Sequence, residues 1–306
     1  MSKLITVFGA TGNQGGSVIR TILADSCLSK EFRIRGVTRD VNKDSSKALT
    51  AQGVEVVQGD MSSPEDMKRV VQGSDIVFLV TNFWEHQSAE PEIAQGKTVA
   101  DACKAEGVRH LIFSSLIDVT KESNGRLVHV THFDGKAEIE RYIRQIGLSA
   151  SFVMPGIFTT ELFNLIHKQE DGSCILATPT STQSPAPFID IVADMGKFVC
   201  AAMLNQSDSG QNTICASSDY YKWDDIPSHF EAATGKKLMV VTVPGEVFKS
   251  FLPGLSPEMK EEIYENLMLL EDPGYYAGAD LTSSLNLLSE KPVGLTEFFT
   301  LNKDRW

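Results

Sequence analysis

Four glycines within eight residues near the start of the chain constrain its fold more than any other feature. The segment Gly9-Ala-Thr-Gly-Asn-Gln-Gly-Gly16 joins a short apolar run to a segment with helical periodicity that begins near Ser17. Here Gly9 permits a tight turn, Gly12 lets the backbone approach a pyrophosphate, and Gly15 lets the helix pack against the strand. The segment predicts a strand–turn–helix unit that binds a dinucleotide, the alternative being a glycine-rich turn without a ligand.

Short apolar runs alternate with helical segments through the first half of the chain. Runs this apolar suit strands that are buried on both faces of a parallel sheet. The alternation predicts an α/β fold with a doubly wound parallel sheet of the Rossmann type. The expected strands are Leu4–Phe8, Phe32–Thr38, Val54–Val57, Ile76–Val80, Leu111–Phe113 and Ala150–Val153.

The alternation ends near Gly156, and the second half is expected to form a smaller α+β lobe. Apolar spacing predicts helices and one strand there, at Phe158–His167, Ile191–Leu204, Trp223–Thr234, Ser256–Leu270 and, for the strand, Leu238–Val243. We therefore expect a dinucleotide-binding domain at residues 1–155 and a lobe at residues 156–306 that packs on it.

Composition excludes several classes of protein. The 28 lysines and arginines stand against 40 aspartates and glutamates, a net charge of −12. This balance argues against a nucleic-acid-binding protein, because phosphate neutralisation needs clustered cations. The five cysteines form no Cys-x-x-Cys pair, so neither a disulfide framework nor a metal site is expected. Since no signal peptide or membrane-spanning run is visible, we expect a cytoplasmic protein.

The residue after the second expected strand is basic. An NAD-selective site usually carries an acid at this strand end, whereas Arg39, followed by Lys43, offers cations to a 2′-phosphate. This favours NADP(H) over NAD(H), the alternative being that Arg39 is a solvated surface charge. Later strand ends supply further candidate cofactor contacts, namely Asp60, Met61, Thr81, Asn82 and Phe83.

The glycine spacing G-x-x-G-x-x-G resembles extended and atypical short-chain dehydrogenase/reductase proteins. Reductases of that kind carry a Tyr-x-x-x-Lys pair, but Thr131-His-Phe-Asp-Gly-Lys136 has no tyrosine four residues before the lysine. His132 and Lys136 share a helical stripe with isoleucines, and a buried lysine needs an anionic or hydroxyl partner. We expect Lys136 to contact the cofactor ribose and His132 to exchange a proton, unless His132 only hydrogen-bonds the backbone.

Several motifs in order resemble the NmrA-like family, an atypical branch of these proteins. They are the glycine loop, Val37-Thr-Arg39, Val57-Gln-Gly-Asp60, Thr81-Asn-Phe-Trp-Glu85 and His132-Phe-Asp-Gly-Lys136. The resemblance covers about residues 3–165 and implies NADP(H) bound across the strand ends. It implies cofactor contacts from Gly9, Thr11, Gly12, Asn13, Gln14, Arg39, Lys43, Asp60, Asn82, Phe83, Lys136, Ile157, Phe158 and Thr159.

The family implies two functional classes, NADP(H)-responsive regulators that bind a protein partner and enzymes that act on small molecules. The missing tyrosine favours the regulator. The enzyme is favoured by Trp84, Ser115 and Phe163, which could line a pocket beside the nicotinamide. An imine needs no tyrosine acid, because an iminium already carries its proton. We favour NADPH-dependent reduction, or redox-linked cyclisation, of a bulky apolar molecule such as a fungal specialised metabolite.

Overall fold

The computed structural model describes residues 2–206 and 211–306. Seven parallel strands form its largest sheet, in the order β11-β6-β5-β4-β1-β2-β3. They are β1 (Lys3–Val7), β2 (Phe32–Thr38), β3 (Glu55–Gln58), β4 (Ile76–Leu79), β5 (His110–Ser114), β6 (Ala150–Pro155) and β11 (Gln211–Ala216). The expected doubly wound parallel sheet is confirmed, and β11 adds a strand that the sequence pattern did not reveal.

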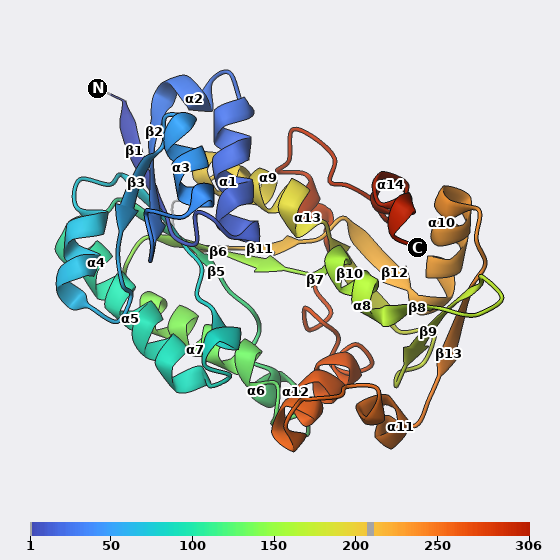
Figure 1. Ribbon diagram of the computed structural model, residues 1–306. Helices are drawn as coiled ribbons and strands as arrows, with labels where there is room; N and C mark the ends of the chain where they lie inside the picture. The colour runs from blue at the N-terminus through green and yellow to red at the C-terminus, as the bar shows by residue number, and fades with distance from the viewer. Residues whose placement is uncertain (1, 207–210) are drawn as a thin grey trace.

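Helices cover both faces of this sheet (Figure 1). One face carries α1 (Asn13–Ala24), α2 (Leu28–Glu31), α3 (Asp44–Ala51) and α9 (Ile191–Leu204), and the other carries α4 (Pro64–Val71), α5 (Ala89–Ala105) and α7 (Thr131–Gln145). In β4, Ile76 and Phe78 join the core under α1 and α9, whereas Val77 and Leu79 join the core under α4, α5 and α7. A strand covered on both faces needs such an unbroken apolar run.

The strand order reverses between β1 and β4. The chain proceeds from β1 outward through β2 and β3, then returns to β4 and continues through β5 and β6 to the other side. In a parallel α/β sheet, such a reversal leaves a crevice at the carboxyl ends of the two strands, and ligands bind there. The fold therefore places the candidate site beside the loops that follow β1 and β4.

The short helix α6 (Val119–Glu122) precedes α7, and a smaller lobe follows β6 (Figure 1). The lobe has two three-stranded sheets, in the orders β12-β10-β7 and β13-β9-β8. Their strands are β7 (Ile157–Phe158), β8 (Ile166–Lys168), β9 (Cys174–Thr178), β10 (Pro185–Ile189), β12 (Asp219–Lys222) and β13 (Leu238–Thr242). The helices are α8 (Leu162–Leu165), α10 (Ile226–Thr234), α11 (Gly245–Ser250), α12 (Pro257–Met268), α13 (Thr282–Leu285) and α14 (Leu295–Leu301).

The helix expected over Phe158–His167 is wrong. Ile157–Phe158 pair with β10, and Ile166–Lys168 pair with β9, so only a 3-10 turn at Thr159–Glu161 and the single turn α8 lie between them. The apolar stripe is real, since Leu162 and Ile166 are buried. Strand hydrogen bonds from distant parts of the chain nevertheless decide the backbone conformation here.

The chain returns from the small lobe to the large sheet. Helix α9 packs on α1, and β11 pairs in parallel with β6. Both elements therefore complete the dinucleotide-binding half, although they follow the small lobe's first strands in sequence. No single boundary near residue 155 separates the two parts.

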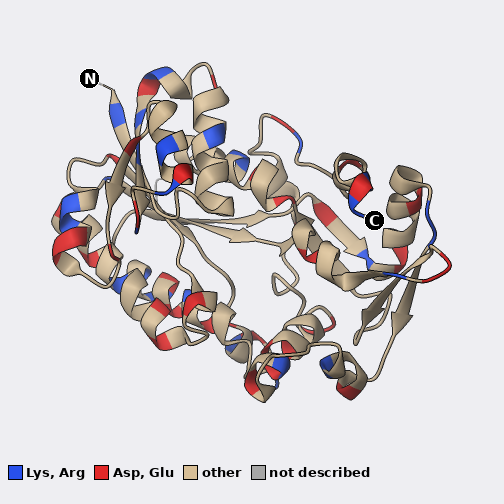
Figure 2. Ribbon diagram, in the orientation of Figure 1, with Lys and Arg blue, Asp and Glu red and all other residues tan. Residues whose placement is uncertain are grey.

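Charged side chains surround the sheet rather than crossing its centre. Strands β5, β6 and β11 contain no lysine, arginine, aspartate or glutamate and run uncharged through the middle of Figure 2. Within the described part of the chain, no helix is both long and apolar enough to cross a membrane.

The contact between α1 and α9 can be tested with Gly196→Ala. A Cβ atom on Gly196 would lie 2.1 Å from Thr21 Oγ1 and 2.4 Å from the Ser17 carbonyl oxygen, so the helices would have to separate. We expect the free energy of unfolding to fall by about 1–3 kcal/mol in urea denaturation, as overpacking usually costs. The control Val192→Ala, on the exposed side of α9, should change it by less than about 0.5 kcal/mol. Equal stability of both variants would contradict this contact.

Candidate functional site

A cleft of about 1510 Å³ crosses the carboxyl ends of the parallel strands. Loops that follow β1 to β6 form one wall, and α11, α12 and the loop between them contribute to the other. Pockets for drug-sized ligands typically measure about 300–1,000 Å³. This cleft is therefore large enough for a dinucleotide together with a second small molecule.

The glycine loop holds the start of α1 against the end of β1. A Cβ atom on Gly15 would lie 2.3 Å from the Gly9 carbonyl oxygen and 2.6 Å from that of Phe8, so only glycine fits. Gly9 itself has a φ of +62°, a conformation that glycine adopts without steric cost. The first N–H groups of a helix have no partner within it, so the start of α1 at Asn13 suits an anion in the cleft.

Three buried polar atoms along the cleft find no hydrogen-bond partner among the described residues. They are Gln14 Oε1 on α1, Ser114 Oγ at the end of β5 and Asn266 Oδ1 on α12. Buried polar atoms in native proteins are nearly always paired, so each of these atoms suits contact with a ligand. Together with the glycine loop they fit a dinucleotide cofactor along the strand ends and a second molecule near α12.

Arg39 follows β2 and lines the cleft. It forms an ion pair with Glu85, which belongs to a one-turn helix after β4. Asp40 lies outside the cleft lining, and its Oδ1 accepts a hydrogen bond from the Asn42 N–H. The strand end therefore presents a cation to the cleft, and a phosphate that binds Arg39 must compete with Glu85.

The fold brings together most of the residues predicted to bind a cofactor. Those that line the cleft are Gly9, Thr11, Gly12, Asn13, Gln14, Arg39, Asp60, Met61, Thr81, Asn82, Phe83, Lys136, Ile157 and Phe158. Two do not: Lys43 is the exposed N-cap residue of α3, and Thr159 is buried in the small lobe. These two side chains are therefore not at the cleft wall.

Lys136 on α7 is nearly buried, and its partners belong to the chain itself. Its Nζ donates to Thr81 Oγ1 at 3.0 Å and forms an ion pair with Glu92 of α5. The two charged side chains are 11% and 1% exposed, and Thr81 Oγ1 also donates to Glu92 at 2.6 Å. We expected a cofactor to supply the partner of Lys136. Glu92 and Thr81 supply it internally, while Lys136 still lines the cleft.

His132 at the start of α7 is held by Glu262 of α12. Its Nδ1 and its backbone N–H both contact Glu262 Oε1, the latter at 3.0 Å. Burial by itself raises the pKa of the Glu262 carboxyl, but hydrogen bonds and charge from His132, with a hydrogen bond from Thr131, bring the pKa below its ordinary value. The imidazole thus has a carboxylate partner, and His132 does not merely hydrogen-bond the backbone.

Ser115 does not reach the cleft, whereas its neighbour Ser114 does. The Ser115 Oγ donates to Glu140 Oε2 at 2.5 Å, beneath α7. Successive residues at a strand end point to opposite sides, so only one of the two hydroxyls can face the strand ends. Ser114 is therefore the serine that lines the cleft.

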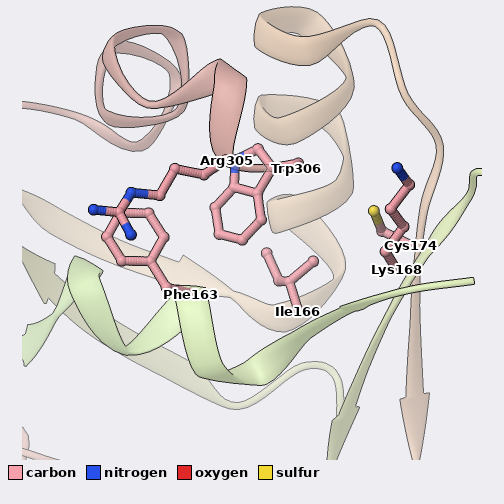
Figure 3. A pocket seen from close by; sticks show the side chains of 6 residues that line it. All are labelled: Phe163, Ile166, Lys168, Cys174, Arg305 and Trp306. Atoms are coloured by element: carbon pink, nitrogen blue, oxygen red, sulfur yellow. The ribbon is translucent and has the colours of Figure 1, made fainter.

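Phe163 lies away from the cleft, whereas Trp84 lines it. Phe163 borders a separate hollow of about 160 Å³, with the Arg305 guanidinium 4.4 Å from its ring centroid and Trp306 beside it (Figure 3). The pairing of β8 with β9 turns the segment after β7 toward the lobe's own core. From the sequence alone, an aromatic residue that lines the cleft could not be distinguished from one that lies in the core of the small lobe.

An apolar wall from the small lobe faces the strand ends. It consists of Phe248, Phe251, Leu252, Leu255, Ile263 and Leu267. Phe251 and Leu255 are large apolar side chains left exposed there, which often marks a binding surface. The sequence pattern does not reveal this wall, nor Glu92 or Glu262. In the α12 segment, charged residues dominate and hide which side of the helix faces the cleft.

Breaking the Lys136–Glu92 pair should cost stability even without a ligand. Removing one partner of a buried ion pair leaves an uncompensated charge, at a cost of about 3–5 kcal/mol. We expect Lys136→Met to lower the free energy of unfolding by this amount in urea denaturation of the cofactor-free protein. The double variant Lys136→Met/Glu92→Met should recover most of the loss.

Lys97→Met is the matched control, because Lys97 and Glu138 also join α5 to α7. Their side chains are 33% and 35% exposed, so the change should stay below about 1 kcal/mol. If Lys136→Met proves as stable as Lys97→Met, the buried pair does not stabilise the chain.

Known proteins are similar to this chain in sequence and in fold. The NmrA-like family matches residues 1–299. The NmrA-like family domain-containing oxidoreductase malD of Malbranchea aurantiaca is 31% identical over 257 residues, which cover 78% of this chain and 75% of that protein.

Two solved structures show the same fold. NmrA, a negative transcriptional regulator in complex with NADP, has a TM-score of 0.82 at 20% identity, over 99% of this chain and 97% of its own. The Citrobacter sp. triphenylmethane reductase complexed with NADP(H) has a TM-score of 0.77 at 20% identity, over 99% of this chain and 100% of its own. Because the family match spans nearly the whole sequence, this chain belongs to the NmrA-like family.

Proposed function

We propose that the protein is an NADPH-dependent oxidoreductase that acts on a bulky apolar small molecule. The observation that carries the proposal is the continuity of the cleft, which runs from the glycine loop to the apolar wall of α11 and α12. A cofactor bound along the strand ends would leave the part of the cleft beside the apolar wall open to a second molecule. When bound, reduced nicotinamide supplies a hydride, which serves either net reduction or a redox-linked cyclisation.

Arg39 supports NADP(H) as the cofactor. It lines the cleft at the end of β2, while Asp40, the acid that an NAD ribose would need, lies outside the lining. A guanidinium matches the geometry of a phosphate and binds it with paired hydrogen bonds. The 2′-phosphate would then replace Glu85 as the partner of Arg39.

Two side chains at the start of α7 are proposed for the reaction centre. Lys136 would contact the cofactor ribose while Glu92 keeps its ammonium in place. His132 borders the cleft beside Trp84, their ring centroids 5.3 Å apart, and would exchange a proton with the substrate. The relative from Malbranchea aurantiaca, named an oxidoreductase, also supports an enzyme.

A second candidate is an NADP(H)-sensing regulator that binds a protein partner. The ammonium of Lys136 is already paired inside the chain, which suits a residue that stabilises the fold rather than one that serves turnover. NmrA, which has the same fold, is named a negative transcriptional regulator. If the protein is such a regulator, the apolar wall contacts a protein partner instead of a substrate.

Transfer of isotope from the cofactor separates the two candidates. NADPH deuterated at nicotinamide C4 is incubated with the protein and a metabolite extract of the organism that encodes it, and mass spectrometry searches for deuterated products. Deuterium in a small molecule, absent when the protein is first heat-unfolded, is the expected result. NADPH that stays bound and unconsumed would instead favour the regulator or a reaction without net reduction.

Arg39→Ala should weaken NADP(H) binding and spare NAD(H). Loss of charged hydrogen bonds to a phosphate costs about 1–3 kcal/mol, which corresponds to a rise in Kd of roughly 5- to 150-fold. Isothermal titration calorimetry with both cofactors measures the difference directly.

Arg109→Ala is the control for this measurement, because Arg109 and Arg39 each have 69% of their side chain exposed. Arg109 precedes β5 and therefore lies at the amino-terminal edge of the sheet, away from the cleft. Its variant should bind both cofactors as the wild type does. Equal losses for NADP(H) and NAD(H) in Arg39→Ala would refute the 2′-phosphate role.

A further inference from the structure

Glu262 contacts the start of α7 through both carboxylate oxygens. Its side chain is 2% exposed. Oε2 accepts hydrogen bonds from the Thr131 N–H at 3.1 Å and the Thr131 hydroxyl at 2.7 Å. Oε1 accepts from the His132 N–H at 3.0 Å and contacts His132 Nδ1. The carboxylate thus sits on the helix N-terminus, where backbone N–H groups and the helix dipole favour a negative charge.

The chemistry of this contact determines which ring nitrogen carries the proton. An ionised carboxylate can only accept hydrogen bonds, and the lowered pKa of Glu262 keeps it ionised near neutral pH. Nδ1 of His132 must therefore carry a hydrogen when it faces Oε1. In the neutral ring the unprotonated nitrogen is then Nε2.

The His132 ring is packed on several sides and borders the cleft. The Phe133 ring lies 4.7 Å from the His132 ring, measured between centroids, and the rings of Trp84 and Phe83 lie 5.3 and 5.7 Å away. His132 also lines the cleft together with Trp84. With Nδ1 taken by Glu262, Nε2 is the nitrogen left to meet a molecule in the cleft.

The other charged groups near His132 each have a partner of their own. Along α7, Asp134 accepts from the Thr120 hydroxyl, and Lys136 pairs with Glu92 of α5. On the α12 side, Glu265 pairs with His129, and Glu261 pairs with Lys249 of α11. Beside Trp84, Glu85 pairs with Arg39. Among the residues that the structure describes, Glu262 is therefore the charged group that contacts the His132 ring.

We propose that Glu262 is the positioning residue for His132, holding the proton on Nδ1 so that Nε2 exchanges a proton with the substrate. This inference rests on the proposed oxidoreductase function. When a substrate atom gains a hydride and its double bond opens, that atom's neighbour takes a proton from the protonated ring. The Nε2–H bond breaks, an O–H or N–H bond forms, and the ring becomes neutral with its hydrogen on Nδ1. Nε2 then takes up one proton from solution, so the substrate has gained one hydride, which reduced nicotinamide would supply, and one proton.

Helix α12 links this proton transfer to substrate binding. Ile263 and Leu267, on the same helix as Glu262, belong to the apolar wall of the cleft. In Figure 1 the helix lies beside the α6–α7 segment and joins the small lobe to the dinucleotide-binding half. A substrate that packs against α12 therefore touches the helix that orients the acid–base group.

The test is the tautomer of His132, read from the ¹⁵N chemical shifts of histidine-labelled protein at a pH where the ring is neutral. In the wild type we expect the proton on Nδ1 in more than nine-tenths of the molecules. In Glu262→Gln the amide can donate or accept, so the preference should fall at least tenfold. Should this variant not fold, the wild-type tautomer alone decides: a proton on Nε2 would overturn the proposal.

Glu265→Gln is the matched control on the same helix. Glu265 holds His129 as Glu262 holds His132, accepting from the His129 N–H at 2.7 Å and contacting Nδ1 at 2.7 Å. Its hydrogen bond raises the pKa of His129, which lies outside the cleft lining. Glu265→Gln should lower the pKa of His129, leave the His132 tautomer as in the wild type and keep kcat within twofold.

Activity adds a second readout that is independent of the first. With the substrate found by deuterium transfer, Glu262→Gln should lose at least tenfold in kcat with KM changed less than twofold. An unchanged kcat, or an unchanged His132 tautomer in that variant, overturns the positioning role. If the wild type transfers no deuterium at all, the oxidoreductase function fails, and the tautomer measurement still decides whether Glu262 positions the ring.

Discussion

The contact of Gly15 with the carbonyl oxygens of Phe8 and Gly9 is the constraint on which the rest of the structure depends. Because no Cβ atom separates them, α1 starts directly above the end of β1 and directs its unpaired N–H groups along the strand ends. Gly196 extends the same principle, since its missing side chain lets α9 pack closely on α1. The cleft therefore owes its position to close backbone contacts at these two glycines.

Helix α7, which carries His132 and Lys136 at the cleft, is held to two other helices through charged contacts. Lys136 joins it to α5 through Glu92, and His132 joins it to α12 through Glu262. Both carboxylates are almost completely buried. Removal of either partner would therefore leave a buried charged or polar group with neither a hydrogen-bond partner nor solvent. The same pairs that hold the helices together therefore fix the two side chains proposed for the chemistry.

The sequence predicts the large sheet well, and in the second half it predicts α9, α10, α12 and β13 but misses most of the short strands, for a physical reason. Strands such as Ile76–Leu79 are buried on both faces, so their composition alone reveals them. The strands Ile157–Phe158 and Ile166–Lys168 exist only because distant segments pair with them, and their apolar spacing imitates a helix. In the site, strand-end residues follow from topology, whereas Glu262 could not be found, because only the packing of α12 on α7 gives it a partner.

The return of α9 and β11 to the large sheet shapes how the chain folds as it is synthesised. Until α9 has emerged from the ribosome, α1 lacks the helix that packs on it, and until β11 has followed, one edge of β6 stays open. The strands β7 to β10 of the small lobe are made during this interval, so they form part of a long connection inside the larger unit. A fragment that stops after residue 155 would keep the pairing of β6 with β5 but leave the other edge of β6 open, free to pair with strands from other chains.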